Sequence, residues 1–252
     1  MSETTGFGLL IIGSELLTGK RQDAHLDFAI GALSKRGLEL DRVEYLGDDP
    51  QRLSARLGHS MAQHDIVFVF GGIGATPDDH TRQCAADAAG LQLRRHPEAA
   101  AIIEERFGES AYPQRIHMAH LPQGSILIPN PVNQIAGFSI EHHHFIPGFP
   151  QMAWPMLEWV LDTHYSHLHH LSVISEHILT LPNVSEGQVI ELLQSFVKRY
   201  PDLNLSCLPH MQDEYRETEL GVRGDADQVS VASAWLGEQL DQLGFHWTEG
   251  GR

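Results

Sequence analysis

A short, wholly apolar run that ends in consecutive glycines is the sequence feature that most restricts the fold. Residues 66–70 (IVFVF) carry no polar side chain and lead directly into the segment GGIGATPDDHT, which begins at Gly71. An apolar run this short, followed by glycine, is typical of a strand buried on both faces of a parallel sheet. An alanine-rich stretch that ends near Gly90 follows. The segment therefore predicts a strand, a glycine-rich turn and a helix in succession.

The same succession occurs twice earlier in the chain. Residues 7–12 and 40–46 predict strands, and apolar residues at helical spacing follow each of them. Asp23 is placed to cap the first of these helices, and Asp49 with Pro50 to begin the second. Three strand-helix units in succession predict a mostly parallel, doubly wound sheet between two layers of helices, a three-layer α/β/α fold.

The remainder of the chain predicts the end of this domain and a second, smaller one. A helix, short strands and a closing helix are expected at residues 98–107, 125–149 and 151–161. The histidine-rich segment HYSHLHH, residues 164–170, is polar, and we interpret it as a solvated linker rather than a metal site. The expected domains are residues 1–165 and a β-α-β-β-α unit at residues 171–252.

Composition restricts the partners and the compartment. The 252 residues include 33 acidic and 17 basic side chains, a formal net charge of -16. Because such a charge repels polyanions and anionic lipid, we expect neither nucleic acid nor a membrane surface as a partner. The chain has two cysteines, Cys84 and Cys207, without metal-ligand spacing, and its N-terminal apolar run is too short for a signal core. A cytoplasmic protein is expected.

The glycine-rich loop is the strongest candidate for chemistry. Gly71, Gly72 and Gly74 allow the backbone to turn successive N–H groups towards an anion, and the following helix adds its N-terminal partial charge. The loop therefore predicts a phosphate site. A purely structural alternative is a tight turn in which Thr76 caps the helix and Pro77 is its first residue.

Carboxylates follow all three predicted strands. Asp78 and Asp79 lie in the loop, where they repel phosphate unless a divalent cation, Mg²⁺ or Mn²⁺, bridges them to it. Glu15, beside Gly13 and Ser14, follows the first strand, and Asp48 follows the second. Because the carboxyl ends of parallel strands meet at one edge of the sheet, these acids are expected to converge there. The structural alternative is that Glu15 and Asp48 are ordinary helix caps or solvated acids. Two basic residues nearby, Lys20 and Arg21, are candidate phosphate contacts.

Other catalytic arrangements find little support. His142, His143 and His144 are consecutive, and side chains that alternate along a strand cannot bind one metal ion together. No order of serine, histidine and aspartate typical of covalent catalysis is present.

Four motifs together resemble those of the competence/damage-inducible protein A (CinA) family. GSELLTGKRQDAH is similar to that family's GTELLLG…N-T-N segment, and GGIGATPDDHT to its GGLGPTxDDLT. NPVNQIAGF resembles its NPVGTAPGF, and IPGFPQMAW its LPGPPxEM. The motifs occur in the family's order over residues 7–162. The molybdopterin-binding proteins of molybdenum-cofactor assembly share the fold and the glycine loop.

The resemblance implies an activity, a ligand and a cofactor. It implies a homo-oligomer that binds a small phosphate-bearing nucleotide or pterin with a divalent cation such as Mg²⁺, Mn²⁺ or Co²⁺. In the CinA family the implied activity is hydrolysis of a nucleotide pyrophosphate such as ADP-ribose, and a related domain acts on FAD. In the molybdopterin group the implied role is binding and adenylylating the pterin phosphate.

The resemblance also assigns roles to particular residues. Asp79 and Asp48 match acidic residues of the family and are the implied metal ligands, while Asp23 matches an acid of the first motif. The residues expected to contact phosphate or ligand are Gly13, Ser14, Gly71, Gly72, Gly74, Thr76, Asp78, Asp23, Asn130 and Asn133. The chain departs from the family at Ala75, His25 and Asn133-Gln134, where proline, asparagine and Gly-Thr are usual.

Three hypotheses for function follow. The first is a metal-dependent pyrophosphatase in which Asp48, Asp79 and Glu15 are catalytic. The second is a pterin-phosphate-binding or adenylylating protein that uses the same loop. The third is a binding module that has lost turnover through the Asn133-Gln134 change. Both enzymes need a phosphate site and a cation, so the sequence does not separate the first two.

Overall fold

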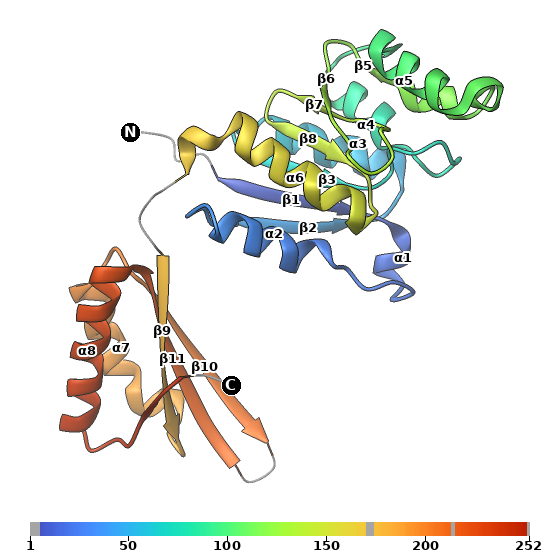
Figure 1. Ribbon diagram of the computed structural model, residues 1–252. Coiled ribbons are helices and arrows are strands. Elements are labelled where there is room, and N and C mark those ends of the chain that lie inside the picture. Colours follow the sequence, from blue (N-terminus) through green and yellow to red (C-terminus); the bar gives the residue numbers. More distant parts are fainter. Residues whose placement is uncertain (1–5, 170–173, 213–214, 251–252) are drawn as a thin grey trace. The chain divides into compact units, whose positions relative to one another are not determined.

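The computed structural model describes residues 6–169, 174–212 and 215–250. The chain divides into two compact units, Met1–His169 and His170–Arg252. The first unit has helices on both faces of a central sheet, and the second has helices on one face of a separate sheet (Figure 1).

The sheet of the first unit is mostly parallel, as predicted. Its strand order is β2-β1-β3-β8-β7-β6, with β1 parallel to both β2 and β3, and β3 parallel to β8. Among these described strands only β7 runs in the opposite direction, and it is antiparallel to both β6 and β8. The strands are β1 (Phe7–Ile12), β2 (Arg42–Leu46), β3 (Ile66–Phe70), β6 (Ile126–Ile128), β7 (Gly137–Ile140) and β8 (His143–Ile146).

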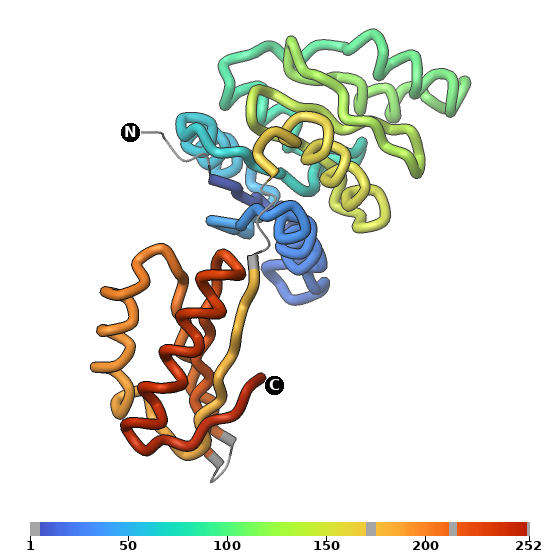
Figure 2. The backbone as a smooth tube through the Cα atoms, turned by 60° about the vertical axis from the view of Figure 1, so that its left-hand side comes forward, coloured from blue at the N-terminus to red at the C-terminus, as the bar shows by residue number. Residues whose placement is uncertain are grey.

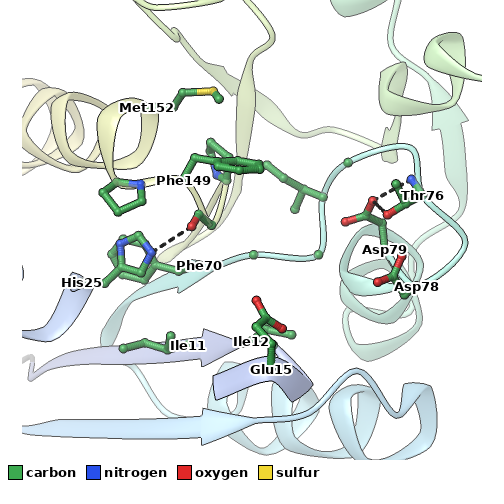
Figure 3. A pocket seen from close by; sticks show the side chains of 18 of the residues that line it. Ile11, Ile12, Glu15, His25, Phe70, Thr76, Asp78, Asp79, Phe149 and Met152 are labelled. Carbon is green, nitrogen blue, oxygen red and sulfur yellow. Dashed lines mark hydrogen bonds between the residues drawn. The ribbon is translucent and has the colours of Figure 1, made fainter. Parts of the chain in front are cut away.

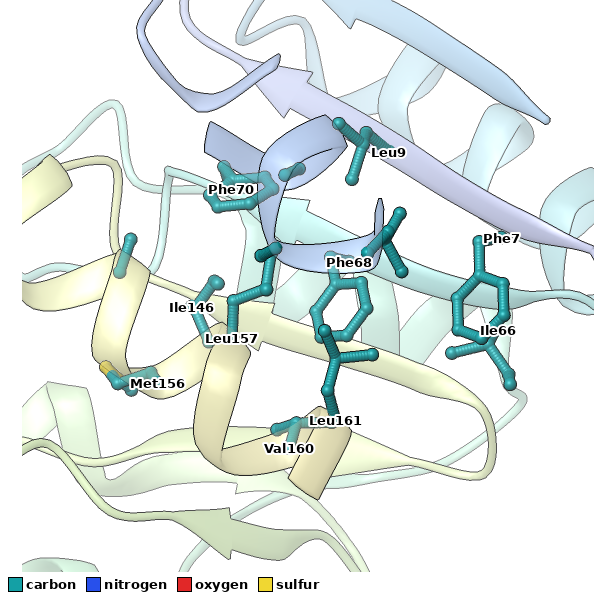
Figure 4. Packing of buried hydrophobic residues seen from close by; sticks show 14 of the residues in the cluster. Phe7, Leu9, Ile66, Phe68, Phe70, Ile146, Met156, Leu157, Val160 and Leu161 are labelled. Carbon is teal, nitrogen blue, oxygen red and sulfur yellow. The ribbon is translucent and has the colours of Figure 1, made fainter. Parts of the chain in front are cut away.

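Two apolar clusters cover the two faces of this sheet, because side chains alternate along each strand. Phe7, Leu9 and Ile11 of β1 pack with α2 (His25–Ser34) and α6 (Pro150–His164), and Figure 4 shows this cluster. Leu10 and Ile12 pack with α3 (Pro50–Met61), α4 (Thr81–Ala88) and α5 (Pro97–Phe107). Each fully buried side chain of this size contributes about 1.5–3 kcal/mol. A wholly apolar strand is therefore stable only between two helical layers.

Several short elements of the first unit were not predicted. They are the helix α1 (Ser14–Leu17), the two-stranded sheet of β4 (Leu93–Arg95) and β5 (His120–Pro122), and the 3-10 helices η1 (Gly108–Ala111), η2 (Arg115–Ala119) and η3 (Ser166–Leu168). They are too short to give a readable hydrophobic period.

The histidines of β8 point to opposite faces, as their spacing predicts. His143 Nε2 lies 2.8 Å from Ser60 Oγ, whereas His144 Nε2 lies 2.7 Å from the Tyr165 hydroxyl oxygen. Tyr165 is buried and its ring packs against Phe7. The prediction of a solvated segment is therefore wrong for Tyr165, which is part of the core, whereas His164 at the end of α6, Ser166 and His167 are exposed, as predicted.

The second unit has the predicted β-α-β-β-α order, with a short strand added. It consists of β9 (Ile174–Pro182), α7 (Glu186–Arg199), β10 (Asn204–Gln212), β11 (Tyr215–Asp225), α8 (Ala226–Gln242) and β12 (Thr248–Glu249). The antiparallel strand order is β10-β11-β9-β12, and both helices lie on one face of the sheet (Figures 1 and 2). Leu179, Leu220, Phe196 and Leu236 are central to its core. No helix in residues 6–169, 174–212 or 215–250 is long and apolar enough to cross a membrane.

Candidate functional site

A cavity of about 470 Å³ lies at the carboxyl ends of β1 and β3 (Figure 3). Its wall combines the glycine loop with the segments that follow β1, β2, β6 and β8. All of the expected site residues line it except Ser14: Gly13, Glu15, Asp23, Asp48, Gly71, Gly72, Gly74, Thr76, Asp78, Asp79, Asn130 and Asn133. Of the two candidate cations, Arg21 lines the cavity and Lys20 does not.

The glycine loop has a backbone shape that other residues adopt with difficulty. Gly71 has φ +97° and Gly72 has φ +67°. A Cβ atom at Gly71 would lie 2.5 Å from the carbonyl oxygen of Ile12, and one at Gly74 would lie 2.6 Å from Asp79 Oδ2. Contacts this short are not found for real Cβ atoms, so glycine is needed at Gly71 for the loop to approach the backbone of β1, whereas a Cβ at Gly74 would require the Asp79 side chain to shift.

Asp79 holds the loop closed. Its Oδ2 atom accepts hydrogen bonds from the Thr76 backbone N–H at 2.7 Å and from the Thr76 hydroxyl at 2.5 Å. Helix α4 begins only at Thr81, so the structural alternative in which Thr76 caps the helix and Pro77 is its first residue is wrong. The loop instead continues for four more residues, because Thr76 bonds to Asp79 within the loop. Asp78 is exposed.

A buried arginine beneath the loop was not predicted from the sequence. Arg82, the second residue of α4, is 8% exposed, and its Nη2 donates to the carbonyl oxygen of Gly74 at 2.7 Å. Its Nη1 donates to the carbonyl oxygens of His117 and His120. Burial lowers the pKa of Arg82, and the negative charge of Asp79 acts in the opposite direction. The guanidinium thus fixes the loop and places positive charge beside it.

Asp48 and Ser14 connect the ends of β2 and β1. The Ser14 N–H donates to Asp48 Oδ2 at 2.9 Å, and the Asp48 N–H donates to Ser14 Oγ at 3.1 Å. Asp48 therefore ties the loop after β2 to the start of α1 while it lines the cavity, and the N-cap of α3 is its neighbour Asp49. Glu15 Oε1 lies 3.9 Å from Arg21 Nη1, and both side chains are about half exposed.

Asp23 caps α2, as predicted. It accepts hydrogen bonds from the backbone N–H groups of His25 and Leu26 at 2.9 and 3.0 Å, and from the Tyr45 hydroxyl at 3.0 Å. Three donors occupy its oxygens. Asp23 therefore fixes the wall of the cavity through these bonds.

His25 forms part of the cavity wall as a neutral ring. It is 5% exposed, stacks on Phe70 with ring centroids 4.3 Å apart, and has Nε2 at 3.3 Å from the Gly148 carbonyl oxygen. Because a carbonyl oxygen only accepts, Nε2 carries the hydrogen. Burial lowers the pKa of His25. The residue that replaces the usual asparagine is thus locked in place.

The two asparagines shape the loop between β6 and β7. Asn130 is buried and its amide bonds to the backbone of Val132, Asn133 and Ile135. Asn133 Oδ1 accepts from the Ile135 N–H at 2.9 Å, and its Nδ2 lies 3.1 Å from Met152 Sδ. Gln134 has φ +65° and is absent from the cavity wall. Of this pair, Asn133 alone changes the surface that a ligand meets.

No group of three or more histidine, cysteine, aspartate or glutamate side chains that could hold a metal ion occurs among the described residues. Asp48 and Asp79 lie in separate loops on the wall of one cavity.

Comparisons with known proteins identify the family of this chain. The family model described as a probable molybdopterin binding domain matches residues 8–167. A CinA-like protein from Citrifermentans bemidjiense is 35% identical over 245 residues, which are 93% of this chain and 57% of that protein. A CinA-like protein from Geobacter sp. (strain M21) is 30% identical over 248 residues, 94% of this chain and 58% of that protein. The chain therefore spans less than three fifths of the length of these relatives.

Among solved structures, the protein CinA with unknown function from Thermoplasma acidophilum is similar to the first unit. It is 26% identical, with a TM-score of 0.59 over 64% of this chain and 98% of that one. The chain thus belongs to the family of the probable molybdopterin binding domain, and it is similar to CinA-like proteins over more than nine tenths of its length.

Proposed function

We propose that this chain binds a small phosphate-bearing nucleotide in the cavity and hydrolyses its pyrophosphate bond with the help of a divalent cation. The observation that carries the proposal is the glycine loop. It lies at the carboxyl ends of parallel strands, with Gly71 and Gly72 at positive φ and the buried charge of Arg82 against it. Backbone N–H groups in such a loop suit phosphate oxygens, and the strand ends of open α/β sheets are where ligands bind.

The carboxylates present fit a hydrated cation better than a protein cage. Mg²⁺ keeps several waters and is usually held by one or two carboxylates together with substrate phosphates. Asp48 and Asp79 supply two carboxylates from two loops of one cavity wall, and the described residues hold no group of three or more such side chains placed to bind a metal ion. When bound, the cation supplies neutralisation of charge on the pyrophosphate.

The chain's own residues have separate roles in this reaction. The loop from Gly71 to Gly74 holds phosphate oxygens, and Arg82 keeps the loop in place. Glu15 or Asp48 orients a water and accepts its proton as the new P–O bond forms and the phosphoanhydride bond breaks. Both carboxylates line the cavity, and Glu15 is half exposed, so a water can reach it.

A second candidate is favoured by the family match. The probable molybdopterin binding domain is named for a pterin ligand, and the same loop would hold a pterin phosphate without hydrolysis. Binding to the native state raises the melting temperature, so a thermal-shift screen separates the candidates. ADP-ribose, FAD, ATP and molybdopterin are tested with and without Mg²⁺ or Mn²⁺, and the products of each stabilising ligand are identified. Metal-dependent release of AMP supports the pyrophosphatase, whereas stabilisation by molybdopterin alone supports the pterin-binding role.

A further inference from the structure

The cavity has a second end whose chemistry differs from that of the glycine loop. Figure 3 shows His25, Phe70, Phe149 and Met152 on the side of the cavity away from Thr76 and Asp79. These side chains are aromatic or apolar apart from the two ring nitrogens of His25, of which Nδ1 is buried without a hydrogen-bond partner. His25 Nε2 bonds to Gly148, and the Asn133 amide contacts Met152 and Ile135. A phosphate has no counter-charge among these four side chains.

Phe149 is the unusual residue at this end. It is 52% exposed although it lines the cavity, and it is absent from the side chains that form the two apolar clusters of this unit. Its backbone is fixed, since its carbonyl oxygen accepts from the N–H groups of Met152 and Ala153 at the start of α6. An exposed aromatic ring on a fixed backbone in a cavity wall offers a face on which another ring can stack.

A cation lies near the same ring. The guanidinium carbon of Arg21 is 5.7 Å from the centre of the Phe149 ring, and Arg21 is itself half exposed and 3.9 Å from Glu15. Arginine stacks on planar π systems as well as bonding to carboxylates. Phe149 and Arg21 thus bring two planar groups from different loops to one end of the cavity.

The size of the cavity also fits a ligand that carries a planar ring. The cavity volume of about 470 Å³ lies within the range of pockets that hold small organic ligands.

We propose that Phe149 is the stacking platform for a planar heteroaromatic ring of the ligand, whose phosphates occupy the glycine loop. The part of this inference that puts the phosphates in the glycine loop rests on the proposed function. A stacking platform selects planarity rather than one base, because every heteroaromatic base has a π face on which Phe149 can stack. Purine, flavin and pterin rings all satisfy it.

The test compares a ligand that has a base with one that has none. Affinities of ADP-ribose and of inorganic pyrophosphate, each as its non-hydrolysable methylene analogue with Mg²⁺, are measured by calorimetry for the wild type, Phe149→Leu and Phe149→Trp. Loss of a stacked base costs about 1–3 kcal/mol, which corresponds to about 5- to 140-fold weaker binding. We expect Phe149→Leu to weaken ADP-ribose by a factor in that range and pyrophosphate by less than about twofold, and Phe149→Trp to retain ADP-ribose affinity.

A matched control comes from another exposed aromatic residue. Tyr112 is 48% exposed, has Arg95 at 5.9 Å from its ring centre, and does not line the cavity. Tyr112→Leu is expected to leave both affinities unchanged. Equal weakening of ADP-ribose and pyrophosphate by Phe149→Leu overturns the inference, as does unchanged ADP-ribose binding in a variant whose thermal melt shows it to be folded.

A phosphate-free arm separates this inference from the proposed function. Saturation-transfer NMR is recorded with adenosine and with neopterin, which have a planar ring and no phosphate. Signals with the wild type that are lost in Phe149→Leu support the platform even if pyrophosphate does not bind. A different result would show that Phe149 is not a stacking platform although the phosphate site exists. In that result pyrophosphate binds, and the binding of adenosine, neopterin and ADP-ribose is the same in the wild type and in Phe149→Leu.

Discussion

Replacing Gly72 by alanine measures how tightly the glycine loop is fitted against α4. Gly72 has φ +67°, and an added Cβ would lie 2.1 Å from Thr81 Oγ1 and 3.2 Å from Thr81 Cβ. Thr81 is fully buried, and its N–H donates to the Gly72 carbonyl oxygen at 3.0 Å. The side chain has little freedom to move away, so the variant combines backbone strain with overpacking.

A control at Gly90 separates the cost of backbone strain from the cost of overpacking. That residue has φ +66° and no atom within 4 Å of an added Cβ, so Gly90→Ala carries the strain alone. Left-handed backbone costs a non-glycine residue about 1–2 kcal/mol, and overpacking adds about 1–3 kcal/mol. We therefore expect Gly90→Ala to lower the free energy of unfolding by about 1–2 kcal/mol and Gly72→Ala by about 2–5 kcal/mol.

A double-mutant cycle then locates the contact. Thr81 Oγ1 is buried without a hydrogen-bond partner in the described structure, so Thr81→Ala removes the obstructing oxygen without breaking a bond. Urea denaturation of Gly72→Ala, Thr81→Ala and the double variant gives the coupling energy. We expect the second substitution to recover at least about 1 kcal/mol of the loss caused by the first. Additive effects within about 0.5 kcal/mol would refute the reasoning that these two groups are in contact.

Four further predictions concern charge, pH and the two units. Asp79→Asn keeps an oxygen for the two bonds from Thr76 but loses the charge, so without metal its melting temperature should be close to that of the wild type, and it should lose most metal-dependent ligand binding. If calorimetry shows wild-type metal affinity in both Asp79→Asn and Asp48→Asn, the shared cation is contradicted. Arg82→Gln removes the positive charge beneath the loop and should weaken pyrophosphate binding about tenfold, which unchanged calorimetric affinity would disprove. Burial lowers the pKa of His143 to about 4 and of His144 to about 3, so below about pH 6.5 the unfolded chain binds more protons than the folded chain. The free energy of unfolding should therefore decrease as the pH is lowered, by about 1.4 kcal/mol per pH unit for each histidine. In urea melts between pH 6 and about 4, the free energy of unfolding of His144→Gln should depend less steeply on pH than that of the wild type. Residues 1–169 produced alone should fold and bind pyrophosphate as the full chain does, and a titration showing lost affinity would mean that the second unit contributes to the site.

Much of the first unit's sheet is readable from the sequence because its central strands are covered on both faces. The wholly apolar runs at residues 7–12 and 66–70 coincide with β1 and β3, because a short run bounded by glycine and apolar at every position suits a strand covered on both faces. Residues 40–46 were predicted as a strand, and β2 begins later, at Arg42, because this strand is only half-buried. The burial of Tyr165 depends on Phe7 and His144, which are distant in sequence, so local polarity gave a wrong interpretation.

The candidate site, too, is predictable from the sequence only in part. The rule that parallel strands end at one edge predicts that Glu15, Asp48 and Asp79 lie on one cavity wall, and they do. The bonds of Asp48 to Ser14 and of Asp79 to Thr76 depend on loop conformation, which no periodicity reveals. Arg82 carries no signal either, because an arginine in the first turn of an alanine-rich helix normally faces solvent, and only the packing of residues 115–120 buries it.

The central claim is that the glycine loop holds phosphate and that Asp48 and Asp79 share a cation there. A crystal structure with Mg²⁺ and a non-hydrolysable methylene analogue of ADP-ribose tests it most directly. The account predicts phosphate oxygens within hydrogen-bonding distance of the N–H groups of residues 72–74, with one cation between the phosphates and both carboxylates. Phosphates bound away from this loop, or a ligand in the loop with no cation at Asp48 and Asp79, would contradict it.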